Sequence, residues 1–311
     1  MHISYLPVHF SIIFDSPVYT DNQPLFVLRS VLGKELHSMC CIANQSQCAD
    51  CMYNKTCAYA FLFETILPQE NQVVPGRNRA SHPFSFTQGK QIIRKTLREY
   101  DFTITLFGKA IDYLPYIYAA FVRTGKNGLF KERVPFTVQK VLVGDKDILV
   151  SAEQLDTSVK PLIFEYNTNE KLNDGKSKKG EVLVELKSPL RFKVSGKYTS
   201  VFSANDFMNC LYRRMSTMCS LYGDSDNISS DNYIASEELQ ITERNLRWSQ
   251  NSHYSVRQKD AMELGGVTGT LKIAGSFTPL DIKLLEFAHI ANAGKNTNFG
   301  FGQLDFWTKW E

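Results

Sequence analysis

The strongest constraint on the fold is one order of apolar patterns that occurs twice along the chain. Residues 4–13 alternate apolar and polar side chains as a half-buried strand does, and residues 25–39 carry the apolar stripe of an amphipathic helix. The first half continues as strand, strand, helix and strand at 83–87, 101–108, 112–124 and 133–143. The second half repeats the order at 181–194, 203–222, 236–249, 265–274, 278–294 and 301–307. The order βαββαβ is that of the ferredoxin-like fold and of the RNA-recognition motif. The sequence therefore predicts an α+β protein with two tandem ferredoxin-like domains.

Capping residues predict where the helices begin and end. Ser203 with Asp206, and Thr278 with Asp281, have the spacing of a capping box at a helix N-terminus. Glycines that follow the apolar stripes predict helix ends at Gly125, Gly223 and Gly294.

A polar, lysine-rich segment separates the two repeats. Residues 167–180, "NTNEKLNDGKSKKG", have the composition of a linker. We therefore expect an N-terminal domain over residues 1–166, with a cysteine-rich insertion at about residues 40–65, and a C-terminal domain over residues 181–311.

The composition is that of a folded protein with no strong charge. The chain has 311 residues, of which 43% are hydrophobic and 22% charged, and its formal net charge is +3. An anionic partner would therefore have to be recognised by local basic groups. The apolar run 113–122 is shorter than the ~20 residues that cross a bilayer. We expect a cytoplasmic protein without membrane contact, in which cysteines stay reduced.

A glycine-rich segment near the end of the chain is the first candidate site. "AGKNTNFGFGQ" at 293–303 places Gly294, Gly300 and Gly302 beside Lys295 and Asn298. Glycines allow neighbouring N–H groups to converge on an anion, but a sharp turn from helix to strand needs glycines as well. The segment 124–130, "TGKNGLF", begins in the same way.

Four cysteines after the first helix have the spacing of a metal site. Cys41, Cys48, Cys51 and Cys57 follow C-x₆-C-x₂-C-x₅-C, which suits a closed, structural zinc ion. Ordinary half-buried thiols and an iron–sulfur cluster are the alternatives, and Cys40 could replace Cys41. Two further cysteines, Cys210 and Cys219, lie on the apolar stripe of a helix and are expected in the core.

Several segments together resemble one family. They are "GGVTGTLKIAG", "AGKNTNFGFGQLDFW", "YSVRQKDAMELGGVTG", "YLPYIYAAFVRTGKNGLF" and the cysteine block "CIANQSQCADCMYNKTCAYAFLFET". In residue pattern and in order, these segments resemble those of the CRISPR-associated endoribonucleases that process precursor crRNA. These enzymes are members of the RAMP superfamily, and the resemblance is to the branch with a four-cysteine insertion. The resemblance spans most of the chain.

The resemblance implies a function in antiviral defence. It predicts that the protein binds the CRISPR repeat of a precursor RNA and cuts it without a metal. The ribose 2′-OH would attack the adjacent phosphate and leave a 2′,3′-cyclic phosphate. It also implies transfer of the mature guide to a CRISPR effector complex. The alternative interpretation is a non-catalytic RAMP subunit that binds crRNA inside such a complex, and a second alternative is an unrelated zinc-containing RNA-binding module.

Proton transfer in such a reaction calls for a histidine. His37 lies on the first helix, opposite the leucine stripe, with Lys34 on the same face at i, i+3 spacing. We expect His37 to act as acid or base and Lys34 to stabilise charge. His289, one turn before the glycine segment, and His253 are the alternatives.

Further residues are candidates for contact with RNA. The resemblance places the segment of Tyr254, Arg257 and Gln258 along the RNA path, and the two glycine-lysine turns add Lys126 and Lys295. The full set predicted to bind RNA is Lys126, Tyr254, Arg257, Gln258, Gly294, Lys295, Asn298, Gly300 and Gly302.

Overall fold

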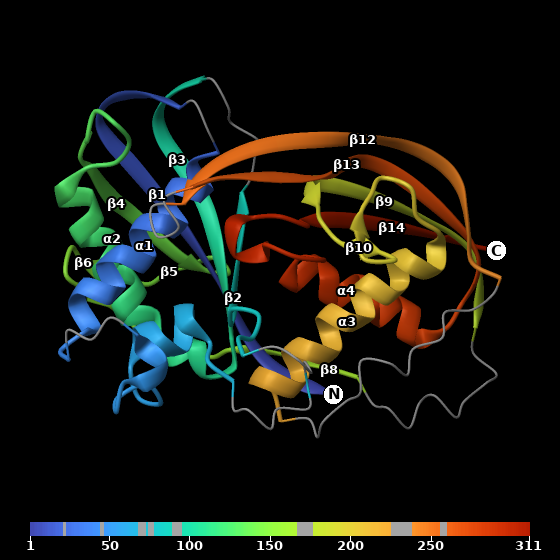
Figure 1. Cartoon of the computed structure of the whole chain (residues 1–311), viewed down its shortest axis with the longest axis horizontal. Helices are drawn as coiled ribbons and strands as arrows, with labels where there is room; N and C mark the ends of the chain where they lie inside the picture. Colours follow the sequence, from blue (N-terminus) through green and yellow to red (C-terminus); the bar gives the residue numbers. More distant parts are fainter. Residues whose placement is uncertain are drawn as a thin grey trace. The chain divides into compact units, whose positions relative to one another are not determined.

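The computed structural model describes residues 1–20, 23–43, 47–67, 73, 78–88, 95–166, 177–224, 238–255 and 260–311 (Figure 1). Within these ranges, only the backbone is described for residues 251–255 and 260–263. The contacts divide the chain into two compact units: residues 4–163, here called the N-terminal unit, and residues 1–3 with 164–311, the C-terminal unit.

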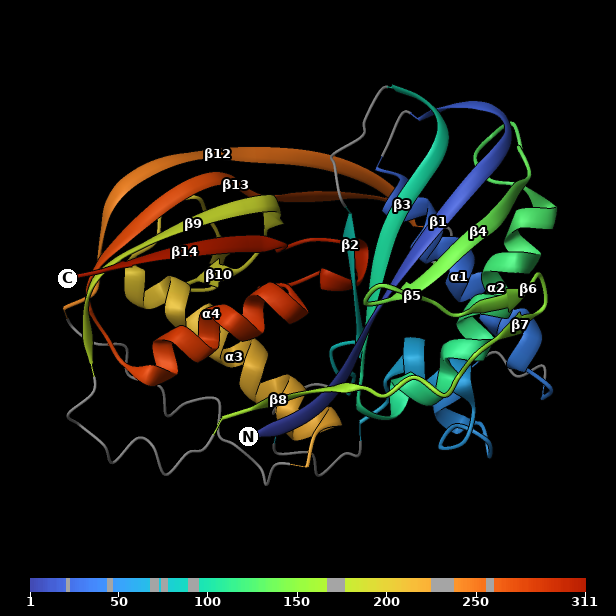
Figure 2. The same ribbon diagram turned by 180° about the vertical axis from the view of Figure 1, so that it is seen from behind.

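The N-terminal unit is an antiparallel sheet with two helices on one face. Its main elements are β1 (His2–Thr20), α1 (Pro24–Cys40), η1 (Cys48–Asp50), η2 (Ala60–Glu64), β2 (Phe84–Gln88), β3 (Lys95–Phe107), η3 (Gly108–Tyr113), α2 (Leu114–Asn127) and β4 (Phe136–Val143). The strand order β2-β3-β1-β4 is that of a ferredoxin-like sheet. Figure 2 shows β3, β1 and β4 side by side in front of α1 and α2. Short strands follow: β5 (Lys146–Asp147), β6 (Leu149–Ser151), β7 (Gln154–Leu155) and β8 (Leu162–Glu165).

Aromatic side chains fill the space between this sheet and its helices. Phe10 on β1 lies 5.4 Å from Phe102 on β3 and 5.3 Å from Phe121 on α2, measured between ring centroids. All three side chains are buried. The alternation in β1 and the stripe in α2 thus meet in one core, as binary patterning requires.

The cysteine-rich insertion is held against α1 by a close contact. A Cβ atom at Gly33 would lie 2.8 Å from the ring of Phe63, so only glycine lets η2 approach the helix this closely. The buried Glu64 accepts a hydrogen bond from Tyr59 at 3.1 Å and pairs with Arg79 at 2.7 Å. The insertion is therefore part of the packed domain.

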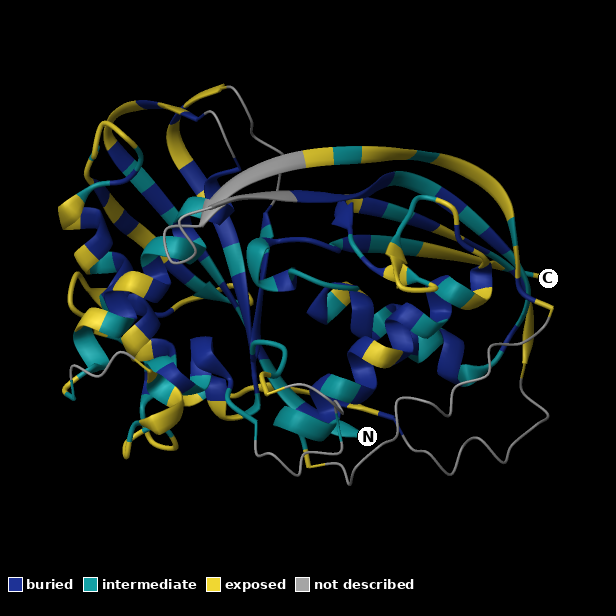
Figure 3. Cartoon of the chain, viewed as in Figure 1, coloured by how far each residue is buried: buried dark blue, intermediate teal, exposed yellow. Residues whose placement is uncertain are grey.

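The C-terminal unit repeats the same architecture. Its elements are β9 (Lys178–Leu190), β10 (Lys193–Val194), β11 (Lys197–Tyr198), α3 (Ala204–Tyr222), β12 (Gln240–Ser255), β13 (Asp260–Phe277), α4 (Pro279–Ala291), η5 (Thr297–Phe299) and β14 (Leu304–Trp310). The strand order is β12-β13-β9-β14, and α3 packs against α4 on one face. Figure 3 colours much of both helices as buried residues. The predicted pair of tandem ferredoxin-like domains with a cysteine-rich insertion is confirmed.

The helix ends follow the capping predictions at three places and depart from them at two. Both capping boxes are present, and Gly223 caps α3. However, α2 continues through Lys126 to Asn127, with Gly128 as its cap, because Gly125 packs in the helix against the backbone of Phe136. Likewise α4 ends at Ala291, and Asn292 takes the cap position with φ +58°. The two glycine-lysine-asparagine segments are therefore not equivalent.

The strand β9 begins at Lys178, inside the segment expected as linker, and residues 167–176 lie outside the description. Cys210 and Cys219 are buried, as predicted. None of the described helices is both long and apolar enough to cross a membrane.

Candidate functional site

Backbone hydrogen bonds define the glycine-rich loop between α4 and β14. The N–H of Ala293 donates to the carbonyl of Gly302 at 2.8 Å, and the N–H of Gly302 donates to that of Pro189 at 3.0 Å. Gly294 and Gly302 have φ of +72° and +73°. A Cβ atom at either position would collide with a carbonyl oxygen, 2.5 Å away at Gly294 and 1.8 Å away at Gly302. The loop therefore needs glycine for its own geometry.

The same hydrogen bonds occupy the glycine amides that the sequence suggested for anion binding. The N–H of Gly300 donates to Thr297 at 3.0 Å, that of Gly302 donates to Pro189, and that of Gly294 hydrogen-bonds the thiol of Cys210. These three amides are satisfied inside the protein. The need for a sharp turn therefore accounts for these three glycines.

A buried arginine fixes the end of α4 from which the loop starts. The guanidinium of Arg214 on α3 donates to the carbonyl oxygen of Ala291 at 3.0 Å. Burial lowers the pKa of Arg214 to about 10, which leaves it charged at neutral pH. A cation at a helix C-terminus is favourable for the helix dipole.

His289 lies on the last turn of α4 with one ring nitrogen engaged. Its Nδ1 is 3.1 Å from the carbonyl oxygen of Leu304 and 3.1 Å from a carboxylate oxygen of Asp305. Asp305 also pairs with Lys187 at 3.1 Å. The His289 side chain is 56% exposed. Both contacts of Nδ1 are with oxygen acceptors, so they favour the proton on Nδ1, and Nε2 is then the ring nitrogen that could accept a proton.

His37 lies on α1 at the edge of the cysteine-rich insertion. Its ring packs edge-on against Tyr59, with centroids 4.8 Å apart. The side chain is half-buried, and Lys34, one turn earlier, is exposed. Neither belongs to the leucine core, as the periodicity predicted.

The insertion's cysteines surround one small cavity. Its volume is ≈ 20 Å³, and its lining includes His37, Cys40, Cys41, Cys48, Cys51, Cys57 and Tyr59. All seven cysteines of the chain are free thiols. Burial, followed by the nearby Glu64 and neighbouring thiols, raises the pKa of Cys48. Among the described residues, no three His, Cys, Asp or Glu side chains are arranged closely enough to hold a metal ion.

The remaining predicted residues fall at several places. Lys126 is exposed on the last turn of α2, and Asn298 lies in η5. His253 and Tyr254 belong to β12, where only the backbone is described, and Arg257 and Gln258 lie outside the described residues.

A further histidine, His82, lies beside α1 and was not among the predicted site residues. The Nε2 atom of His82 is 3.1 Å from a terminal nitrogen of Arg29. Because arginine only donates, Nε2 accepts, and the ring carries its proton on Nδ1. The Arg29 guanidinium also lies 5.0 Å from the centroid of the Phe63 ring. No motif surrounds His82, so sequence reasoning had no signal for this pair.

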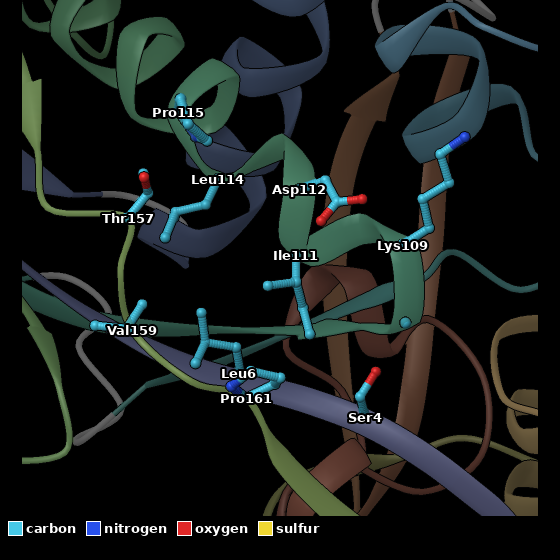
Figure 4. A pocket seen from close by; sticks show the side chains of 11 residues that line it. Ser4, Leu6, Lys109, Ile111, Asp112, Leu114, Pro115, Thr157, Val159 and Pro161 are labelled. Carbon is cyan, nitrogen blue, oxygen red and sulfur yellow. The ribbon is translucent and has the colours of Figure 1, made fainter.

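A larger pocket of ≈ 600 Å³ opens in the N-terminal unit between β1, η3 and residues 157–161. In Figure 4 the side chains of Leu6, Ile111 and Val159 converge, whereas Lys109 points away. None of the predicted site residues lines this pocket.

Two family models match the chain. Residues 3–165 match AF_1859_N, described as an N-terminal domain. Residues 184–304 match the CRISPR-associated endoribonuclease Cas6. No curated protein matches the sequence.

Solved structures share the fold over nearly the whole chain. A Cas6 product complex has a TM-score of 0.55 and 12% identity, covering 98% of this chain and 99% of that one. Cas6 from Thermus thermophilus has a TM-score of 0.51 and 13% identity, with coverage of 98% and 99%. A partial Cas6-RT-Cas1–Cas2 complex has a TM-score of 0.53 and 12% identity over 99% of this chain and 46% of the other. The chain therefore belongs to the family that AF_1859_N describes, with that N-terminal domain at residues 3–165, and its residues 184–304 match the CRISPR-associated endoribonuclease Cas6.

Proposed function

We propose that the protein is a metal-independent, sequence-specific endoribonuclease that cuts CRISPR repeat RNA in precursor transcripts to give mature crRNA. The observation that carries the proposal is the match of residues 184–304 to the Cas6 endoribonuclease family. The matched segment contains the glycine-rich loop and His289.

The proposed reaction is an internal transesterification. The ribose 2′-OH loses its proton to a base and attacks the adjacent phosphorus, while the 5′-oxygen of the next nucleotide leaves with a proton from an acid. The products are a 2′,3′-cyclic phosphate and a 5′-hydroxyl, so no water or metal enters the balance. General acid–base help of this kind contributes roughly 10²–10⁴-fold to the rate.

We assign the proton transfer to His37, with charge stabilisation by Lys34. The half-buried ring of His37 is fixed by Tyr59, and the exposed ammonium of Lys34 lies one turn away on the same helix face. His289 is the second candidate, because its engaged Nδ1 leaves Nε2 available. His253 is the third, on the basis of the family resemblance.

The direct test is cleavage of the cognate repeat RNA by the purified full chain in magnesium-free buffer with EDTA. We expect one cut per repeat, a cyclic-phosphate end, and complete loss of cleavage when the ribose 5′ to the cut is 2′-deoxy. The melting temperature of the protein is measured in the same buffer as a control for metal loss.

The other outcomes of this experiment are informative. Binding without cutting would overturn the proposal in favour of a non-catalytic crRNA-binding subunit. Cleavage of the 2′-deoxy RNA would exclude the transesterification. Cleavage that needs added magnesium would exclude metal independence.

We also propose that Cys41, Cys48, Cys51 and Cys57 bind a structural zinc ion. Support comes from the cavity that all four line, whose ≈ 20 Å³ exceeds the roughly 10–15 Å³ needed by one water-sized occupant. Four thiolates would close the coordination shell, so the metal would stabilise the insertion and take no part in the reaction. The thiols would have to move together to bind it.

A further inference from the structure

Three cationic side chains surround one phenol beside the glycine-rich loop. In the hairpin of β10 and β11, Lys193 lies directly opposite Tyr198, which places both side chains on one face. The Tyr198 ring centroid is 3.8 Å from Cζ of Arg191, 5.2 Å from Nζ of Lys193 and 5.8 Å from Nζ of Lys295. The hairpin and the loop thus place three positive charges around one ring.

Backbone contacts hold this cluster together. The N–H of Lys295 donates to the carbonyl oxygen of Arg191 at 2.8 Å, and Gly294 packs against the same carbonyl. The side chain of Arg191 donates from Nη1 to the carbonyl oxygen of Gly265 at 2.9 Å. These hydrogen bonds connect the segment at Arg191 with the glycine-rich loop and with β13, so the three cations are held close to one another.

The charge of the cluster is not compensated within the protein. Other lysines of this unit pair with carboxylates, for example Lys187 with Asp305 and Lys272 with Glu243. In the described part of the chain, Arg191, Lys193 and Lys295 form no ion pair. The buried Nε of Arg191 also has no hydrogen-bond partner there. Cations held together in this way repel one another, and an anion between them would remove that cost.

The three cations change the pKa of the Tyr198 phenol. Burial by itself would raise the pKa of Tyr198, but the Arg191 guanidinium and the charges of Lys295 and Lys193 outweigh it and lower the pKa. The O–H is thereby a better hydrogen-bond donor to an anion.

We propose that Arg191, Lys193, Tyr198 and Lys295 form a binding site for a phosphate of the RNA backbone that positions the substrate and takes no part in proton transfer. The inference rests on the proposed function, which supplies RNA as the ligand. Ammonium and guanidinium groups recognise a phosphate without regard to the base. The cluster should therefore strengthen binding equally for the repeat and for unrelated RNA.

The test compares wild type with a full-length double variant that carries both Lys193→Gln and Lys295→Gln. Each neutralised phosphate contact lowers the slope of log K against log [salt] by about 1. Slopes of about 0.7–0.9 per phosphate correspond to roughly 5–8-fold in affinity per lysine at 0.1 M relative to 1 M salt. We expect the double variant to bind repeat RNA about 25-fold or more weakly at 0.1 M salt. A scrambled single strand of the same length should lose the same factor.

Two controls make the result specific. Lys197→Gln changes an exposed lysine of the same hairpin whose side chain points to the opposite face from Tyr198, and its affinity should stay within about 2-fold of wild type. Replacing both cluster lysines by arginine keeps the charge and should restore most of the affinity.

The experiment distinguishes failure of the phosphate site from failure of the proposed endoribonuclease function. If wild type cleaves and the double variant binds both RNAs as tightly as wild type, the phosphate site is excluded while the endoribonuclease stands. A variant that reaches the wild-type single-turnover rate at saturating RNA has a positioning defect, as expected. A rate that stays 100-fold low at saturation would instead give the cluster a role in the chemical step and overturn the assignment. If wild type binds RNA without cutting it, the binding comparison still decides the site.

Discussion

A Cβ atom at Gly302 would lie 1.8 Å from the carbonyl oxygen of Ala293, and φ at this residue is +73°. Gly196, in the β10–β11 hairpin, has a similar φ of +81° but open space around its missing side chain. Gly196 therefore needs glycine only for its positive φ, whereas Gly302 needs it both for its positive φ and for the close approach of another backbone segment.

Replacing each of these glycines by alanine should therefore have different effects on stability. Gly196→Ala brings only the strain of a positive φ, about 1–2 kcal/mol of unfolding free energy. Gly302→Ala adds a clash with backbone and should cost about 3 kcal/mol or more. Urea unfolding monitored by circular dichroism measures both, and equal losses would contradict the role assigned to close packing.

His37 is the residue on which the proposed chemistry depends. His37→Ala should bind repeat RNA within about 3-fold of wild type and slow single-turnover cleavage by at least ~100-fold, because the proton-transfer group is removed. Ser38→Ala, an exposed neighbour on the same helix, is the matched control and should cleave normally. If His37→Ala cleaves at the wild-type rate, His37 is not the proton-transfer group. The same measurement is then made on His289→Ala and on His253→Ala.

The insertion and α1 form one packed element, in which Gly33 admits Phe63 and His37 packs against Tyr59. The cysteine cavity lies at this contact. A metal bound there would stabilise the surroundings of His37 without touching the substrate. Loss of the metal should therefore act indirectly, through folding.

The zinc proposal predicts about one equivalent of metal per chain in purified protein, measured by mass spectrometry. Cys48→Ser combined with Cys51→Ser should retain less than about a tenth of that and lower the melting temperature. Cys210→Ala removes a buried thiol of the C-terminal unit and should keep the metal. Iron in place of zinc, or wild-type protein without metal, would contradict the proposal.

Local sequence signals were sufficient for most elements. The capping boxes at Ser203 and Thr278 are formed as the spacing predicts, because both partners are within one helical turn. The end of α2 was not predictable, since Gly125 stays helical through its packing against Phe136, a residue of another element. The same limit applies to His82 and Arg29, which are brought together by folding alone.

Each unit of the molecule has its own sheet, helices and core. Phe121 is fully buried in the N-terminal unit, and Phe207 is equally buried in the C-terminal one. Units of this size usually unfold cooperatively by themselves.

Scanning calorimetry should therefore resolve two transitions. Phe121→Ala, which should cost about 3–5 kcal/mol through the cavity it leaves, is expected to lower only the transition of the N-terminal unit by several degrees. Gly302→Ala should lower only the other transition. A single transition shifted equally by both substitutions would show that the units unfold together.

The sequence by itself determined the tandem βαββαβ order, the core faces and the cysteine spacing, because these follow from periodicities of two and about 3.6 residues and from short-range contacts. Only the tertiary structure decided that the glycine amides of the loop are used internally. It also decided that Arg191, Lys193 and Lys295 meet around Tyr198. Those arrangements depend on register between strands and on close approach of distant backbone, which no local pattern records.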